Sequence, residues 1–211
     1  NATPMLRNVF KTDAKVIKKA RLYITARGIY EVHINGQRIS NEYFNPGLTQ
    51  YNKNHMYQTY DITGSLKNGQ VNAIGAWLSE GWWSGNITFS GDSWNFFGDR
   101  QSLLAKLHIQ YADGTEQIIT TNPDQWTYFN DGPVRYGSFF QGEVYDAQKE
   151  APIAGWSTAN FKPTAWKPAQ KISLEGNAFV GSVPNALKFD GMQLVGQLDD
   201  HVQVREVLQA K

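Results

Sequence analysis

Aromatic rings and polar side chains gather between residues 81 and 100, in a stretch without a regular hydrophobic period. Flat rings can stack on the faces of sugars, and side-chain amides can hydrogen-bond sugar hydroxyls. A long irregular segment in a compact domain is usually functional or disordered, and so many rings argue against disorder. The stretch therefore predicts a carbohydrate-binding loop, whose candidate contacts are Trp82, Trp83, Asn86, Trp94 and Asn95.

The same rings also have a purely structural interpretation. Trp is usually well buried, so the loop could fold over one face of the domain and bury its own rings. It could also pack against another domain, because exposed apolar patches mark interfaces as well as ligand sites. The residue types alone leave binding and packing open as alternatives.

Two acidic residues of this loop, Asp92 and Asp99, are candidate calcium ligands. Calcium is a hard cation that prefers oxygen ligands. A zinc site is not indicated, because His33 and His55 stand alone and the chain has no cysteine. Calcium is therefore the one cofactor that the sequence brings into consideration.

A second polar stretch, residues 45–55, adds Tyr51 and Asn54 as candidate sugar contacts. The ring and the amide could serve the same purposes as those of the first loop. The alternative interpretation of this stretch is a crossover at the edge of a β-sandwich.

Catalytic carboxylates are not expected in this chain. Glycoside hydrolysis needs two carboxyl groups about 5–10 Å apart across the scissile bond. Acidic residues do stand near rings, as Glu80 does beside Trp82, and Glu143 lies close to Asp146. Each has an ordinary explanation in a turn or a loop, where carboxylates accept hydrogen bonds.

The overall composition excludes several classes of partner. The net charge is +1 and the basic residues are scattered, whereas nucleic-acid and membrane surfaces attract clustered Lys or Arg. No apolar run approaches the ~20 residues of a membrane span. The lack of cysteine excludes disulfides and thiolate sites and leaves the compartment open.

Alternating apolar residues predict the β-strands that must position these loops. Asn35-Gly36 and Asp113-Gly114 predict hairpin turns, because these residues tolerate positive φ. No segment has a sustained helical period, and short strands with frequent turns predict an all-β fold, a jelly-roll β-sandwich. The predicted strands are residues 21–26, 30–34, 71–78, 103–111 and 116–121.

Composition divides the chain into three parts. Residues 1–19 are expected to be a leading strand or linker that starts with a tag-cleavage remnant, since no initiating Met is present. Residues 20–170 form the predicted β-sandwich module. Residues 171–211 lack aromatic clusters but contain strand-like pieces at 192–195 and 201–208. We expect them to form a return strand and a connector to a further, catalytic domain.

Three parts of the sequence together resemble the N-terminal module of bacterial α-L-rhamnosidases, a group of glycoside hydrolases. In this chain Leu48 stands where the family usually has Trp, which removes one candidate stacking ring, and Trp83 stands where Tyr is common. The resemblance covers residues 20–170, and its motifs lie in Ala20–Gly36, Asn45–Tyr51, Tyr57–Thr63, Asn72–Gly75, Gly81–Gly85, Gly142–Ala147 and Gly155-Trp156.

This resemblance implies a galactose-binding-like β-sandwich and a non-catalytic role. In such enzymes the catalytic carboxylates lie on a separate, downstream helical barrel, which a chain of 211 residues is too short to contain. The implied partners are a rhamnose-containing glycan or glycoside and that catalytic domain of the same polypeptide. Some modules of this kind bind L-rhamnose through a calcium ion, and a periplasmic or secreted location is favoured over a cytoplasmic one.

Two functions follow as alternatives. The module could recognise rhamnosides for the parent enzyme, or it could be a structural buttress that packs on the catalytic barrel without sugar affinity of its own. A third hypothesis makes the chain itself an enzyme, and turnover of an aryl rhamnoside would be needed to support it.

Overall fold

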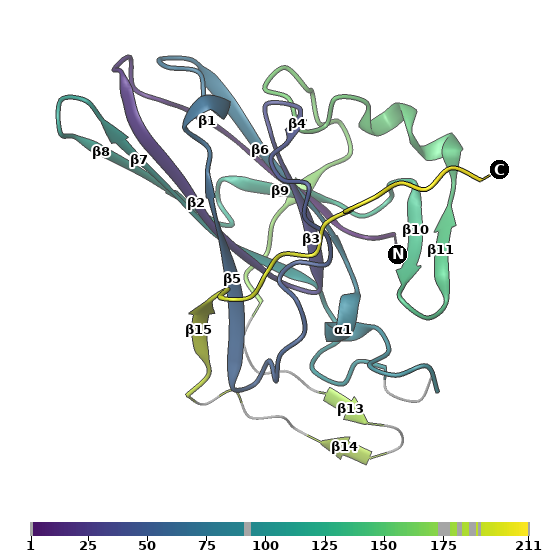
Figure 1. The fold of residues 1–211 in the computed structure, drawn as a ribbon. Helices are drawn as coiled ribbons and strands as arrows, with labels where there is room; N and C mark the ends of the chain where they lie inside the picture. The colour runs from purple at the N-terminus through teal and green to yellow at the C-terminus, as the bar shows by residue number, and fades with distance from the viewer. Residues whose placement is uncertain are drawn as a thin grey trace.

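Two β-sheets packed face to face make up the body of the protein (Figure 1). The computed structural model describes residues 2–90, 94–172, 178–180, 183–185, 189 and 191–210. One sheet has six strands, in the order β12 (Lys167–Pro168), β9 (Trp126–Phe129), β1 (Met5–Lys11), β6 (Val71–Ser79), β3 (Ile29–Ile34) and β4 (Gln37–Arg38). The other has five, in the order β15 (Gln193–Gly196), β5 (Asn54–Asp61), β2 (Ile17–Arg27), β7 (Ser102–Tyr111) and β8 (Glu116–Thr120).

Smaller elements decorate the two sheets. Two separate hairpins are formed by β10 (Val134–Ser138) with β11 (Gly142–Tyr145), and by β13 (Ala178–Val180) with β14 (Val183–Asn185). The helical elements are α1 (Gly81–Ser84) and the 3₁₀ turns η1 (Thr63–Ser65), η2 (Ala147–Lys149) and η3 (Ala151–Ile153). No helix among the described residues is long and apolar enough to cross a membrane.

The core between the sheets is built from the alternating residues of the strands. On β2 the side chains of Leu22, Ile24 and Ala26 are buried, and they face the partner sheet while their neighbours point outward. Strands β3, β6 and β7 contribute their own inward sets to the same core. The predicted all-β sandwich is therefore confirmed, together with the inward faces of residues 21–26, 30–34 and 103–111.

The predicted turns also form. Asn35 and Gly36 join β3 to β4 with φ values of 51° and 87°, the positive range that a two-residue hairpin requires. Between β7 and β8, Gly114 has φ 85°, and the Asp113 carboxylate accepts hydrogen bonds from the backbone and hydroxyl of Thr115. The first turn thus depends on residues that tolerate positive φ, and the second is held by local side-chain hydrogen bonds of Asp113.

The two ends of the chain both join the sandwich. Strand β1, which lies in the part described from sequence as a leading strand or linker, is an inner strand between β6 and β9. Strand β15 pairs in parallel with β5 at the edge of the five-stranded sheet. The strand-like pattern of residues 201–208 does not form a strand here, and only Gln203 makes an isolated bridge, with Glu42.

Candidate functional site

Residues 80–90 and 94–100 lie in the connection that follows β6, at one end of the sandwich (Figure 1). The loop begins with the single helical turn α1. Gly81 has φ 54°, and a Cβ atom there would lie 2.8 Å from Cγ2 of Ile29, so glycine is needed at this close approach to β3. Farther along, the backbone N–H of Asn95 donates to the carbonyl of Ser84 at 3.2 Å. The helical turn therefore anchors both halves of the loop.

Three rings form a buried cluster under this loop, the loop core, defined as Tyr51, Trp83 and Phe97. Trp83 and Tyr51 are each only 1% exposed. The Trp83 and Phe97 rings are stacked, and the Trp83 Nε1–H donates to the carbonyl of Arg100 at 3.1 Å. The Arg27 guanidinium lies 5.0 Å from the centre of the Trp83 ring.

The expected sugar contacts at Tyr51 and Trp83 are therefore revised. Neither ring has an exposed face on which a sugar could stack, because each is enclosed by the other and by Phe97. Their role in this structure is to pack the loop onto the sandwich. For these two residues, the packing alternative is the one that the geometry supports.

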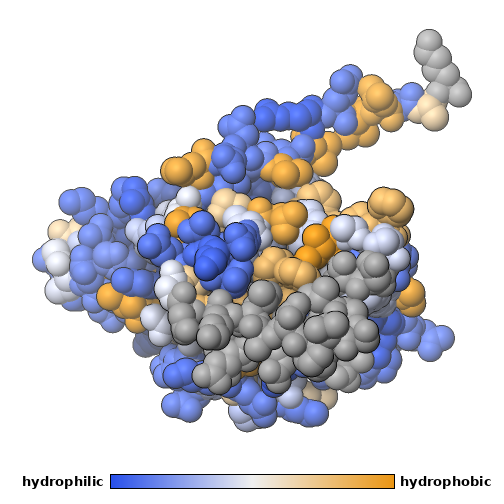
Figure 2. Space-filling model, turned by 90° about the horizontal axis from the view of Figure 1, so that it is seen from below, coloured by the Kyte–Doolittle hydropathy of each residue, from blue (hydrophilic) through white to orange (hydrophobic). Residues whose placement is uncertain are grey.

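A second set of rings is less buried and is here called the aromatic ridge. It consists of two contacting groups, Phe44 with Trp82 and Phe139, and Trp94 with Tyr136. The half-buried Trp82 ring lies 4.2 Å from the ring of Phe139, with an angle of 31° between their planes. Phe139 contacts Phe44 edge-on at 5.1 Å, and Trp94 lies 6.1 Å from Tyr136. Figure 2 shows hydrophobic surface interspersed with hydrophilic groups at this end of the molecule.

The ridge joins three segments that are distant in sequence. Phe44 belongs to the loop before β5, Trp82 and Trp94 to the loop after β6, and the other two rings to the β10–β11 hairpin. The Ser79 hydroxyl, at the end of β6, donates to the carbonyl of Gly137 at 3.1 Å and fixes the hairpin beside the loop. Sequence reasoning did not select Phe44, Tyr136 or Phe139, because nothing in the sequence places the hairpin here.

The three candidate amides lie in different environments. Asn95 is half-buried beside Trp94 and has φ 53°. Asn54 is exposed at the start of β5, opposite Gln193 of β15. Asn86 is only 1% exposed, and neither its Oδ1 nor its Nδ2 atom has a hydrogen-bond partner. Asn95 alone of the three lies next to a ring of the ridge in sequence.

Of the two candidate calcium ligands, only Asp99 lies within the described residues. Asp92 lies outside them, and the exposed Asp99 pairs with Arg100, with 3.2 Å between Oδ1 and Nε. Within the described residues, no group of three or more His, Asp or Glu could hold a metal. Two buried oxygens near α1 have no hydrogen-bond partner, namely Oε2 of Glu80 and Oδ1 of Asn86.

Glu80 is the titratable group of the loop whose environment differs most from water. Burial raises the pKa of its carboxyl group from 4.5 to about 7, because desolvation disfavours the charged form. Its Oε2 atom lies 3.5 Å from the position that a Cβ atom on Gly85 would occupy, under the backbone of the loop. The sequence offered only the proximity of Glu80 to Trp82 as a signal.

This raised pKa predicts a pH-dependent stability. At this carboxyl group the folded state binds more protons than the unfolded state between pH 4.5 and about 7, so the contribution of Glu80 to the free energy of unfolding falls as pH rises through that window and is constant above it. In Glu80→Gln this decrease in the free energy of unfolding should be smaller by about 1–2 kcal/mol. This value is lower than the full pKa shift would give, because solvent screens a group that is only half-buried. Urea denaturation at pH 5 and pH 8 measures it. Glu143→Gln, on exposed β11, is the control that should keep the fall unchanged.

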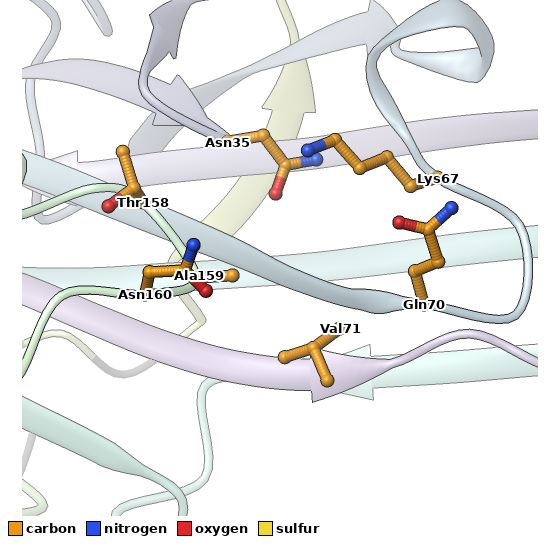
Figure 3. Close-up of a pocket in the computed structure, with 7 residues that line it drawn as sticks. All are labelled: Asn35, Lys67, Gln70, Val71, Thr158, Ala159 and Asn160. Atoms are coloured by element: carbon orange, nitrogen blue, oxygen red, sulfur yellow. The ribbon is translucent and has the colours of Figure 1, made fainter.

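A separate polar cavity lies beside Val71 at the start of β6, whereas α1 follows the other end of this strand (Figure 3). Its volume is about 470 Å³. The Asn35 side-chain amide already donates hydrogen bonds to the carbonyl of Ser65 and to Oδ1 of Asn72, so it is not free to bind a ligand. No aromatic ring lines the cavity, which lacks the stacking surface that the ridge offers. The lining residues are Asn35, Lys67, Gln70, Val71, Thr158, Ala159 and Asn160.

Comparison with known proteins places the chain in a family. Residues 15–204 match the model of the alpha-L-rhamnosidase N-terminal domain. An alpha-L-rhamnosidase of Streptomyces avermitilis is 38% identical over the whole chain, which corresponds to 18% of that protein. One of Alteromonas sp. is 38% identical over 78% of the chain and 17% of its own length.

Solved structures agree with the sequence relatives. The Streptomyces avermitilis alpha-L-rhamnosidase complexed with L-rhamnose superposes with a TM-score of 0.80 at 36% identity, over 97% of this chain and 18% of that one. The Aspergillus terreus enzyme gives 0.76 at 37% identity, over 82% of this chain and 19% of that one. The chain thus spans less than a fifth of these relatives. From its sequence and its fold, the chain belongs to the α-L-rhamnosidase N-terminal domain family.

Proposed function

We propose that this domain recognises rhamnose-containing glycans or glycosides on the aromatic ridge, for an α-L-rhamnosidase of which it is a part. The domain itself is non-catalytic. The observation that carries the proposal is the pair of half-buried rings Trp82 and Phe139, which lie 4.2 Å apart and are each partly exposed. The relative from Streptomyces avermitilis was solved with L-rhamnose, which supports the choice of sugar.

The loop core supports this role by holding the ridge in place. Trp82 and Trp83 are adjacent on α1, so the buried Trp83 ring fixes the backbone that presents Trp82. A preformed ring surface loses little conformational freedom on binding, which favours affinity. The rings would stack on the apolar face of the sugar, and Asn95 would hydrogen-bond its hydroxyls.

Calcium is part of the proposal as a second ligand. An ion near α1 would draw on Oε2 of Glu80 and Oδ1 of Asn86, which are oxygens of the type that calcium prefers. Asp92 and Asp99 remain proposed ligands from the sequence. Because calcium takes 6–8 oxygen ligands, sugar hydroxyls and water would complete its shell.

Titration with L-rhamnose by calorimetry tests the proposal, once with calcium and once with EDTA. We expect saturable binding, and we expect Trp82→Ala to weaken it about five- to tenfold, since a lost stacking ring is worth about 1–1.5 kcal/mol. Tyr23→Ala is the control, because this half-buried ring lies on β2 and pairs with Tyr57 instead. It should leave the affinity unchanged.

The possible outcomes of the titration distinguish a calcium-dependent site, a site made of rings alone, and no sugar binding. Binding that disappears in EDTA would support the calcium ligand, and binding unaffected by EDTA would favour the rings alone. No binding up to millimolar sugar in either buffer would reject recognition by this domain. Turnover of an aryl rhamnoside by the chain alone would overturn the non-catalytic assignment.

The second candidate function is a structural buttress for a catalytic domain. It is favoured by the exposure of apolar rings near the ridge, with Phe44 43% and Phe140 44% exposed. Large accessible apolar groups mark protein interfaces as well as ligand sites. A buttress would bind no monosaccharide by itself, so the same titration separates the two functions.

A further inference from the structure

The C-terminal segment, defined as residues 197–208, is attached to the sandwich through its first half. Next to β15, the Gln197 side chain accepts a hydrogen bond from the buried Gln58 amide at 2.6 Å. Nδ1 of His201 lies 3.0 Å from a carboxylate oxygen of Glu42. The segment is therefore held in one register along the loop before β5.

This attachment ends at residue 203. The carbonyl of Val202 accepts from the backbone of Tyr43 at 2.9 Å, and Gln203 bridges to Glu42. Beyond that point, no hydrogen bond joins residues 204–210 to the rest of the described structure. Figure 2 shows this part of the chain leaving the body as an extended arm with hydrophobic groups along it.

The arm carries the pattern of a β-strand. Val202, Val204 and Leu208 fall on one face of an extended chain, with Glu206 as the polar exception. They are 53%, 59% and 81% exposed. Val favours strands, and an extended backbone with one apolar face is stabilised when it joins a sheet that buries that face. Within the described part of this domain, residues 204–208 do not pair with either sheet.

We propose that residues 202–208 form a β-strand on the edge of a sheet in the part of the same polypeptide that follows this domain, outside the helical barrel. The relatives are more than five times as long as the matched part, and the matched family is an N-terminal domain. The polypeptide that continues from this segment would therefore lie next to the arm. The anchored half would then fix the position of the two domains relative to each other, independently of whether the ridge binds sugar.

Hydrogen exchange read by mass spectrometry tests this strand, in the 211-residue chain and in the full-length polypeptide of the same gene. The amides of residues 204–208 should all exchange freely in the isolated domain, and those on alternate residues that donate to the partner strand should exchange at least a hundredfold more slowly in the full-length protein. Equal exchange in both would overturn the proposal. Protection that instead rises with the concentration of the isolated domain would show pairing between two copies, and would also overturn it.

Proline substitution gives an independent test in the full-length protein. Adjacent amides of a strand point in opposite directions, so either Arg205 or Glu206 must donate to the proposed partner. Proline removes that donor, and one of Arg205→Pro and Glu206→Pro should lower the melting temperature by several degrees. Gln209→Pro, just beyond the proposed strand, is the matched control. If neither substitution differs from the control, the strand does not form.

Discussion

Trp83→Ala is expected to lower the free energy of unfolding by about 3–5 kcal/mol, the range for removal of a large buried aromatic side chain. The ring is 1% exposed and forms the centre of the loop core. Its atoms also define the path of the loop, because a Cβ atom on Gly98 would lie only 2.6 Å from Cζ2 of Trp83. Without the ring, the backbone at Gly98 loses the surface against which it packs.

Trp82→Ala is the matched comparison, since it removes the same side chain from the adjacent position. The Trp82 ring is half-buried, lies against Phe139 and also packs on the loop core, so we expect a smaller loss of about 1–2 kcal/mol. Urea denaturation followed by circular dichroism measures both variants. Equal losses would mean that the loop core is not formed in solution, and sugar affinity would then be expected to depend on both rings alike.

The strands and turns could be predicted from the sequence because their signals are local. The alternation in residues 21–26 requires only that one face of a strand be buried, and Asn35-Gly36 requires only positive φ. Both features are satisfied within a few residues of chain. Strand β1 was the less obvious element, because its buried residues include the polar Arg7 and Asn8, which obscure the alternation.

The division of the loop rings into buried and accessible ones could not be predicted in the same way. Adjacent residues on a helix point about 100° apart, so Trp82 and Trp83 cannot point in the same direction, but a four-residue helix has no period that predicts which of them is buried. The packing of Tyr51 against Trp83 is a long-range contact between two loops. The position of the β10–β11 hairpin, which supplies Phe139 to the ridge, is likewise a tertiary feature.

Two of the motifs that carried the family resemblance meet in space, on the outer face of the six-stranded sheet. Gly75 lies on β6, and the buried Trp156 ring crosses directly over it. A Cβ atom on Gly75 would be 2.3 Å from Cζ3 of Trp156, closer than any van der Waals contact allows. In the sequence, Gly75 and Trp156 belong to separate motifs. Their close approach in the structure explains why a residue without a side chain is needed opposite this ring.

The surroundings of Trp156 leave its ring little room to move. The Trp156 carbonyl accepts a hydrogen bond from Nε of Arg7 at 2.9 Å, and its ring stacks on that of Trp166 with an angle of 15° between the planes. His33 lies on the neighbouring strand, with its ring 5.4 Å from that of Trp156. An added methyl group at Gly75 would therefore have to displace a ring that is held on several sides.

Gly75→Ala should accordingly lower the free energy of unfolding by about 2–3 kcal/mol, the upper part of the range for overpacking a well-packed site. Gly64→Ala is the control, because a Cβ atom there would meet nothing within 4 Å and its effect should stay within about 0.5 kcal/mol. A double-mutant cycle with Trp156→Ala isolates the contact, since the methyl group should cost little once the ring is gone. If the two substitutions were additive in urea denaturation, the clash between Gly75 and Trp156 would not be the cause of the loss.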